Sequence, residues 1–217
     1  MNTSSHPVRS KLNSLLRWVD SEATYREEFL SQRRSEWLRV IPFGLVHLTC
    51  LAVFWVGWSP VAVGVALAAY AVRMFAITGF YHRYFSHRSY RTSRIGQFVF
   101  ALLGATAVQR GPLWWAAHHR HHHRHSDTEH DVHSPRHHGF LYSHVTWIFN
   151  PSNWEPDYGT VKDLTRYPEL VWLDRHTYLP AILLGFGVWL ICSNRRWFGL
   201  QPCTLAVFLP AAIFRRR

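Results

Sequence analysis

The sequence predicts an all-α protein, a multi-pass membrane helical bundle of two to four transmembrane helices with a histidine-rich helical cap. Apolar residues gather in long blocks, basic residues fall between them, and six of the 16 histidines lie within residues 118–125. The 217 residues are long enough for one domain. We divide this predicted domain into an N-terminal segment (1–39), a transmembrane hairpin (40–80), a histidine region (81–176) and C-terminal apolar spans (177–214).

The basic composition favours a membrane protein over a nucleic-acid-binding one. A formal net charge of +11 is compatible with nucleic acid on its own. Basic residues beside long apolar spans are more typical of the cytoplasmic face of a membrane protein, so we expect no nucleic-acid partner. The three cysteines lie in apolar blocks without a CxxC spacing, which disfavours a disulfide set or a thiolate metal site.

The first element is polar and the next two are apolar. Residues 1–39 show no cleavable signal peptide, and we expect a surface helix over 18–38. Between residues 40 and 80 the only charged residue is Arg73, and Ser59-Pro60 divides the block into spans of about 19 and 21 residues. Each span just crosses a hydrocarbon core of roughly 30 Å. Arg73 either snorkels to the inner surface, which we favour, or is a functional buried charge.

The later elements alternate between apolar and polar. Residues 95–109 are apolar but too short to span comfortably, and predict an interfacial or partly buried helix that Arg110-Gly111-Pro112 ends. Residues 140–147 predict a helix along the membrane surface. A polar loop is predicted over 150–176, because it contains three prolines.

Two more apolar stretches close the chain, and the basic residues set the topology. A third span is predicted over 177–193, and a further stretch follows over 197–214. Seven Lys and Arg residues precede the first span, eleven lie between His82 and His176, and none lies in the loop of the hairpin. The positive-inside rule therefore places the N-terminus and the histidine region in the cytosol.

Two groups of histidines stand out. His82 and His87 lie five residues apart, which on one α-helix separates them by about 140°. They share one metal only if the helix ends between them, and otherwise reach different metals. In the tract, a His-x-x-His-His pattern on a helix converges on one side within roughly 100°. Two registers satisfy it, and spacing does not choose between them; they are His118/His121/His122 and His119/His122/His123.

The number of histidines available as metal ligands indicates redox chemistry at a membrane. Neutral imidazoles suit iron, zinc or copper, and the chain lacks the Glu-x-x-His pattern of soluble di-iron bundles. A structural zinc site needs four ligands, and more than four histidines are present. Two histidine groups beside apolar spans favour a dinuclear centre that uses O2 on a lipid C–H bond. A zinc hydrolase and a non-catalytic metal-binding protein remain alternatives.

Two motifs resemble the first and second histidine boxes of the membrane fatty acid desaturases, in the acyl-CoA (stearoyl-CoA, Δ9-type) branch. The resemblance is strongest to bacterial members of that branch. They are residues 81–90, YHRYFSHRSY, and residues 119–128, HRHHHRHSDT. The match of the second motif selects the register His119, His122 and His123, with Asp131 and His133 at a following Asp-x-His. Residues 143–147, SHVTW, also resemble a segment of that family.

The resemblance implies a fold, a reaction and a set of roles. The family has four spans and a cytosolic cap, a di-iron centre, and an O2-dependent reaction that inserts a cis double bond, Δ9 here, into a fatty acyl chain. The iron ligands carried over are His82, His87, His119, His122 and His123, with no catalytic residue beyond them. Gln109 and Trp115 match positions that line the acyl tunnel.

The resemblance also implies partners and a location. These are an acyl-CoA or another acyl carrier, a ferredoxin, rubredoxin or cytochrome b5 type electron donor, and a lipid membrane, which we expect to be a bacterial inner membrane. The family's arginine before the second box is replaced by Ala117, which disfavours acyl-CoA. Its third histidine box has no counterpart, so we expect a C-terminally incomplete member that is inactive as an isolated chain. A lipid or alkane hydroxylase of the same superfamily is the alternative enzyme.

Overall fold

The computed structural model describes residues 35–56 and 60–193, and every regular element within these ranges is a helix. The predicted all-α class is therefore confirmed for this part of the chain. The predicted apolar stretch over 197–214, and most of the predicted surface helix over 18–38, lie outside the described residues.

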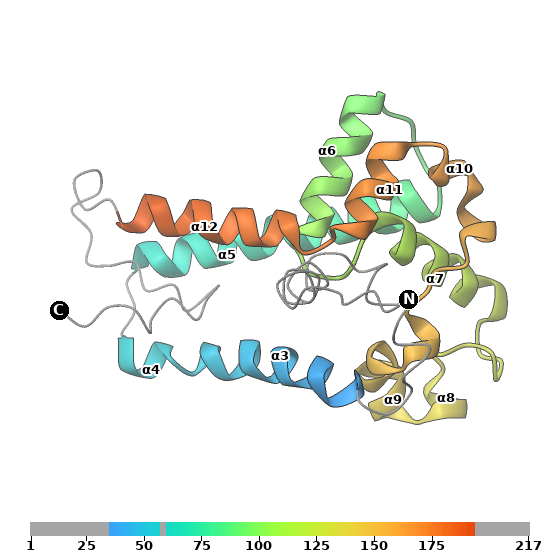
Figure 1. The fold of residues 1–217 in the computed structure, drawn as a ribbon, viewed down its shortest axis with the longest axis horizontal. Coiled ribbons are helices and arrows are strands. Elements are labelled where there is room, and N and C mark those ends of the chain that lie inside the picture. The colour runs from blue at the N-terminus through green and yellow to red at the C-terminus, as the bar shows by residue number, and fades with distance from the viewer. Residues whose placement is uncertain (1–34, 57–59, 194–217) are drawn as a thin grey trace, which may run out of the picture.

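The predicted hairpin has one broken arm and one continuous arm. Its first arm consists of α3 (Ser35–Cys50) and α4 (Val53–Val56), which a turn separates. Its second arm consists of α5 (Pro60–Phe75), followed without a break by the π-helix η1 (Ala76–Ser86). In Figure 1 these arms extend to one side of a group of shorter helices that contains the histidine tract.

The arms expose their apolar side chains. Trp55 is 83% exposed and Leu67 is 64% exposed, as are many similar side chains along both arms. Large contiguous apolar surfaces of this kind need an apolar environment. Among the described residues one continuous helix, Ala62–Ser86, is long and apolar enough to cross a membrane; Phe43–Trp55 and Leu179–Val188 are shorter apolar helices.

The break before the histidine tract is confirmed. α6 (Arg94–Ala105) is capped by Ser93, whose hydroxyl accepts a hydrogen bond from the N–H of Gly96. As predicted, this helix is partly buried. Arg110 adopts a positive φ of 66°, so the chain turns sharply there. Then α7 (Pro112–His125) begins, with proline at a first-turn position where no N–H is needed.

The segment predicted as a loop over 150–176 is mostly helical, so that prediction was wrong. It contains the 3-10 helices η3 (Pro151–Asn153) and η4 (Tyr158–Val161), and then α10 (Lys162–Thr165) and α11 (Pro168–Arg175). Pro168 starts a helix instead of breaking one. The segment belongs to the core, because its side chains Val161, Leu164, Leu170 and Leu173 are fully buried.

The remaining described elements are α8, α9, η2 and α12. The predicted surface helix over 140–147 divides into α9 (Phe140–His144) and the 3-10 helix η2 (Thr146–Phe149), and the short α8 (Pro135–His138) precedes it. Phe140 is 73% exposed. α12 (Leu179–Ser193) occupies the predicted third apolar span and contacts α6.

One core joins the helices that carry the histidines. Tyr81 and Phe85 of η1 are fully buried in a core to which α6, α7 and α11 also contribute, and η1 contacts α6 and α7. The Tyr81 ring lies against Gly104, where an added Cβ would meet the ring at 2.0 Å. Tyr81 also donates its hydroxyl to the carbonyl of Ala101 at 3.1 Å. This packing holds the C-terminal end of η1 against α7, and the histidines lie along that seam.

Candidate metal centre

Four imidazoles from two separate segments converge on one point. One ring nitrogen of each lies within 4.8 Å of those of the other three; the residues are His82, His87, His119 and His123. The Nε2 atom of His87 lies 3.1 Å from Nε2 of His82 and 3.1 Å from Nε2 of His119. The Nε2 atoms of His119 and His123 are 3.0 Å apart. Each nitrogen can turn one lone pair toward the common centre.

The π-helix explains how His82 and His87 meet. A π-helix pairs residue i with residue i+5, and such helices often mark functional sites. The N–H of His87, the residue directly after η1, donates to the carbonyl of His82 at 3.1 Å. The five-residue spacing thus places the two rings 4.6 Å apart between centroids. The expected separation of 140° does not apply, because it assumed α-helical winding.

The other two ligands come from successive turns of α7. His119 and His123 lie four residues apart on this helix, so their rings face the same side. The Trp115 ring stacks on His119, with centroids 4.8 Å apart and planes tilted by 23°. The start of α7 is fixed by the buried Asp174, whose carboxylate accepts the N–H groups of Leu113 and Trp114. An acidic group at a helix N-terminus is favourable.

His122 borders this group but is not one of its four members. Its Nδ1 lies 2.9 Å from Oδ1 of Asp131, and its ring lies 5.4 Å from that of His133. Asp131 is 1% exposed and also accepts the backbone N–H groups of His133 and Asp127. A carboxylate that holds one nitrogen of an imidazole orients the other nitrogen for a metal. The structure therefore separates His122 from the four converging histidines, and its predicted role stays a prediction.

The remaining histidines of the tract have structural contacts. His118 stacks on Trp114 at 4.1 Å between centroids, and its Nδ1 lies 2.9 Å from the Trp114 carbonyl. His121 packs against His125. Of the two registers that spacing left open, His119/His122/His123 supplies two members of the converging group, whereas His118/His121/His122 supplies none.

The electrostatics favour neutral imidazoles, which are the form that binds metal. Burial, aided by the neighbouring imidazoles, lowers the pKa of His119 to about 3. Burial and then the His82 imidazole lower the pKa of His87. Both rings are therefore deprotonated at neutral pH.

The distances fit one transition-metal ion. Two nitrogens that each lie about 2.1 Å from an ion and at a right angle are about 3.0 Å apart. Three nitrogen pairs of the group lie at 3.0–3.1 Å. Imidazole nitrogens suit iron, zinc and copper. The four histidines can thus hold one such ion.

The two predicted substrate-lining residues lie next to each other. The Nε1–H of Trp115 donates to Oε1 of Gln109 at 3.4 Å, and the Trp115 ring also contacts His82 edge-on. Trp115 packs against the hydrophobic core and is half-buried, whereas Gln109 is exposed. The structure thus places an aromatic wall beside the histidine group.

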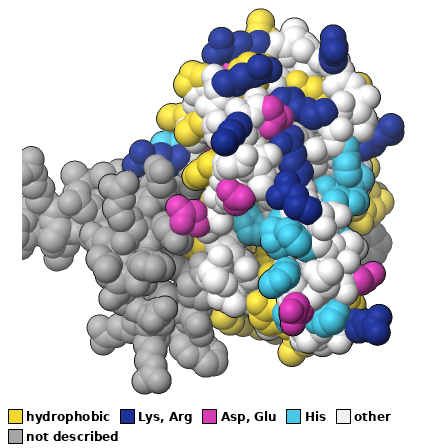
Figure 2. Space-filling view, turned by 90° about the vertical axis from the view of Figure 1, so that its right-hand side faces the viewer, with side chains coloured by type: hydrophobic (Ala, Val, Ile, Leu, Met, Phe, Trp, Pro, Cys, Tyr) yellow, Lys and Arg dark blue, Asp and Glu magenta, His cyan; other side chains and the backbone are white. Residues whose placement is uncertain are grey.

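Reasoning from the sequence missed the polar residues that surround this group. Arg120 and Asp163 form an ion pair at 2.8 Å, and Asp163 also binds Arg88 at 2.7 Å. Arg120 lies inside the second motif, but no spacing rule links it to Asp163, which lies 43 residues away. Figure 2 shows one face of the molecule on which histidine side chains reach the surface beside Lys and Arg side chains.

Comparison with known proteins finds one family. A model of the fatty acid desaturase family matches residues 57–215. An sn-2 palmitoyl-lipid 9-desaturase of Nostoc sp. (strain 36) is 37% identical over 187 residues, covering 75% of this chain and 64% of that protein. Acyl-CoA 5-desaturase AL21 of Anemone leveillei is 37% identical over 173 residues, covering 73% and 53%.

A plant relative gives the same result. Delta-9 acyl-lipid desaturase 1 of Arabidopsis thaliana is 36% identical over 145 residues, covering 65% of this chain and 47% of that protein. The chain thus spans about half to two thirds of the length of these curated relatives. All three have names that describe oxidoreductases acting on acyl chains.

Proposed function

This chain belongs to the fatty acid desaturase family, and we propose that it is a membrane-bound, iron-dependent fatty acyl desaturase that inserts a cis double bond at the Δ9 position. The observation that carries the proposal is the convergence of His82, His87, His119 and His123 at the end of an apolar helix. Such a placement brings a metal to the surface of a lipid phase. The Δ9 position rests on the names of the relatives, two of which are 9-desaturases.

The residues of the chain hold and shield the metal. A pair of iron ions would supply the activation of O2 that removes two hydrogens from adjacent methylenes. The four histidines would hold the first ion through their ring nitrogens. The Trp115 ring, stacked on His119, limits the rotation of that ligand and covers one side of it. Gln109 accepts a hydrogen bond from the indole of Trp115 through its amide oxygen. We expect both residues to line the path of an acyl chain.

A second ion would bind at His122. Asp131 holds Nδ1 of His122, which leaves Nε2 for a metal. Within the described residues no second group of three or more histidine, cysteine or carboxylate side chains accompanies His122. We therefore expect this chain alone to bind one ion tightly and to show no robust desaturation.

The partners and the location follow from the same reasoning. The substrate is a fatty acyl chain on a lipid, on CoA or on another acyl carrier, and the electrons come from a ferredoxin, rubredoxin or cytochrome b5 type donor. The chain crosses a bacterial inner membrane several times with its histidines in the cytosol. The apolar exposure of both hairpin arms supports this arrangement.

The test is expression of the full chain in a desaturase-deficient bacterium. Membrane fatty acids are analysed by gas chromatography, and metal content is measured on the purified protein in detergent. We expect bound iron in wild type, its loss in His82→Ala and its retention in the exposed control His130→Ala. Unsaturated product would contradict the expected inactivity, and a hydroxylated product would indicate the alternative hydroxylase. A metal content that His82→Ala leaves unchanged would overturn the four-histidine site.

A further inference from the structure

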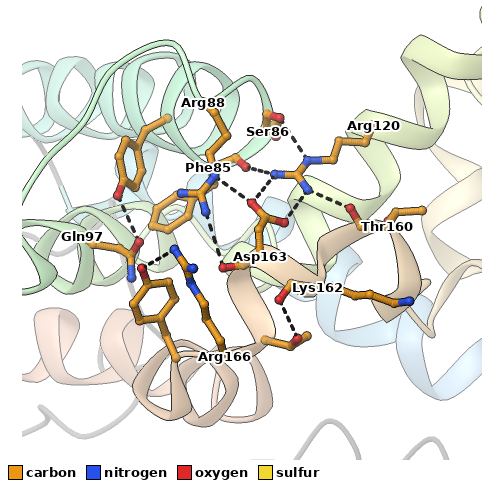
Figure 3. Close-up of polar contacts among 12 residues, drawn as sticks. Phe85, Ser86, Arg88, Gln97, Arg120, Thr160, Lys162, Asp163 and Arg166 are labelled. Carbon is orange, nitrogen blue, oxygen red and sulfur yellow. Dashed lines mark hydrogen bonds and ion pairs between the residues drawn. The ribbon is translucent and has the colours of Figure 1, made fainter.

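Arg120, the residue after His119, lies at the centre of a polar network next to the four-histidine group. Its side chain is 19% exposed and reaches from α7 across to η1 and to the start of α10 (Figure 3). A guanidinium has five N–H donors. All five are used, by the carbonyls of Phe85, Ser86 and Thr160 and by both carboxylate oxygens of Asp163, at 2.7–3.0 Å.

Two of these bonds cap the π-helix. The last carbonyls of a helix have no partner within it. Here the carbonyls of Phe85 and Ser86, the last two residues of η1, accept from Arg120 at 2.8 and 3.0 Å. A cation at the C-terminus of a helix is also electrostatically favourable. The residue that follows these carbonyls is His87, so the cap lies one peptide from a metal ligand.

Asp163 joins the two ligand segments through their arginines. It binds Arg120, which follows His119, and it binds Nε of Arg88, which follows His87, at 2.7 Å. Arg88 has a positive φ of 54°, a conformation that L residues rarely adopt. The ion pair therefore holds the chain in an unfavourable turn immediately after His87. One carboxylate thus fixes the separation between the two histidines whose Nε2 atoms are 3.1 Å apart.

We propose that Arg120 and Asp163 are positioning residues that set the geometry of the metal site by clamping the end of the π-helix to α7. This clamp, formed by Arg120 and Asp163, acts through His87, and neither residue is one of the four converging histidines. Lysine cannot replace Arg120, because a single ammonium nitrogen cannot cap two carbonyls and also hold a carboxylate at two points. This inference rests on the metal site of the proposed function but not on desaturation.

The experiment is a Co²⁺ titration of the full metal-free chain in detergent, followed through the visible ligand-field absorption. The variants are Arg120→Lys and Asp163→Asn. The matched control is Arg94→Lys, since Arg94 makes a two-point ion pair with Glu169 at 2.7 and 2.8 Å away from the histidines. Far-ultraviolet circular dichroism checks the helix content of each variant.

We expect each clamp variant to weaken Co²⁺ binding by about 10-fold to 100-fold, the range for residues that orient metal ligands, and to shift the absorption bands. Arg94→Lys should change neither. If Arg120→Lys loses helix content, Asp163→Asn decides. Clamp variants with wild-type affinity and spectrum overturn the inference, even if they are less stable to heat. Wild type that binds no Co²⁺ overturns the metal site itself, and the clamp's role with it.

Discussion

The Nε2 atom of His87 lies 3.1 Å from Nε2 of His119, although 32 residues separate them in the chain. This contact joins the π-helix to α7 and makes one site from two motifs. We expect His87→Ala to weaken Co²⁺ binding by more than about 100-fold, because a direct ligand should exceed the 10–100-fold effect of outer partners. Titration of the purified chain measures this, with His130→Ala as the matched control. A small loss would show that His87 is not a ligand.

Removal of His122 should have a different effect. Its Nδ1 lies 2.9 Å from Asp131, and it is not among the four histidines whose nitrogens converge. We expect His122→Ala to retain one equivalent of Co²⁺ with affinity within about twofold of wild type, since none of the four donors is lost. The stoichiometry of the titration is the measurement. Loss of that equivalent would place His122 in the first site.

Asp131 should contribute to stability as well as to orientation. It is 1% exposed and accepts three hydrogen bonds, from His122 and from the backbone N–H groups of His133 and Asp127. We expect Asp131→Asn to lower the free energy of unfolding by about 1–3 kcal/mol, because a buried partner is lost. Thermal unfolding in detergent measures it. Asp157→Asn is the control, since asparagine can keep that exposed turn.

Gly111 should not tolerate a side chain. An added Cβ would meet Oδ1 of Asp174 at 2.0 Å and the Asp174 Cα at 2.5 Å. We expect Gly111→Ala to cost about 1–3 kcal/mol of stability, as overpacking does, and to move the start of α7. Gly187→Ala is the control, because no atom lies within 4 Å of its added Cβ. Equal unfolding temperatures for the two variants would contradict the tight contact.

The metal-free protein should lose stability in mild acid. Burial lowers the pKa of His118 to about 4 and, with its neighbouring imidazoles, that of His119 to about 3. Below the unfolded value of about 6.5 the unfolded chain binds more protons. The stability is therefore complete above about pH 6.5 and falls as the pH drops toward 4 and then 3. Urea unfolding at several pH values tests this, and a flat profile would contradict it.

Local signals predicted the helices around the tract well, and tertiary contacts explain what they missed. Arg110-Gly111-Pro112 fixed the start of α7, because a turn and an N-terminal proline are encoded locally. Whether His82 and His87 share one metal was left open, because their spacing does not reveal π winding; the last carbonyls of that helix accept hydrogen bonds from Arg120 of another helix.

The helices between residues 150 and 176 were missed for a related reason. Each is eight residues or shorter, and their prolines resembled loop signals. What stabilises α10 and α11 is the burial of Leu164 and Leu170 against the core, which no short window of sequence reveals. Asp163, which completes the network behind the site, lies in that same segment.

The π winding of η1 makes the pitch of one helix a property of the site. Its 11 residues follow the winding in which an N–H reaches back five positions. If the same residues took ordinary α winding, His82 and His87 would lie about 140° apart around the helix and would no longer face one centre. The pitch of the helix between Ala76 and Ser86 is therefore as much a part of the metal site as the imidazoles are.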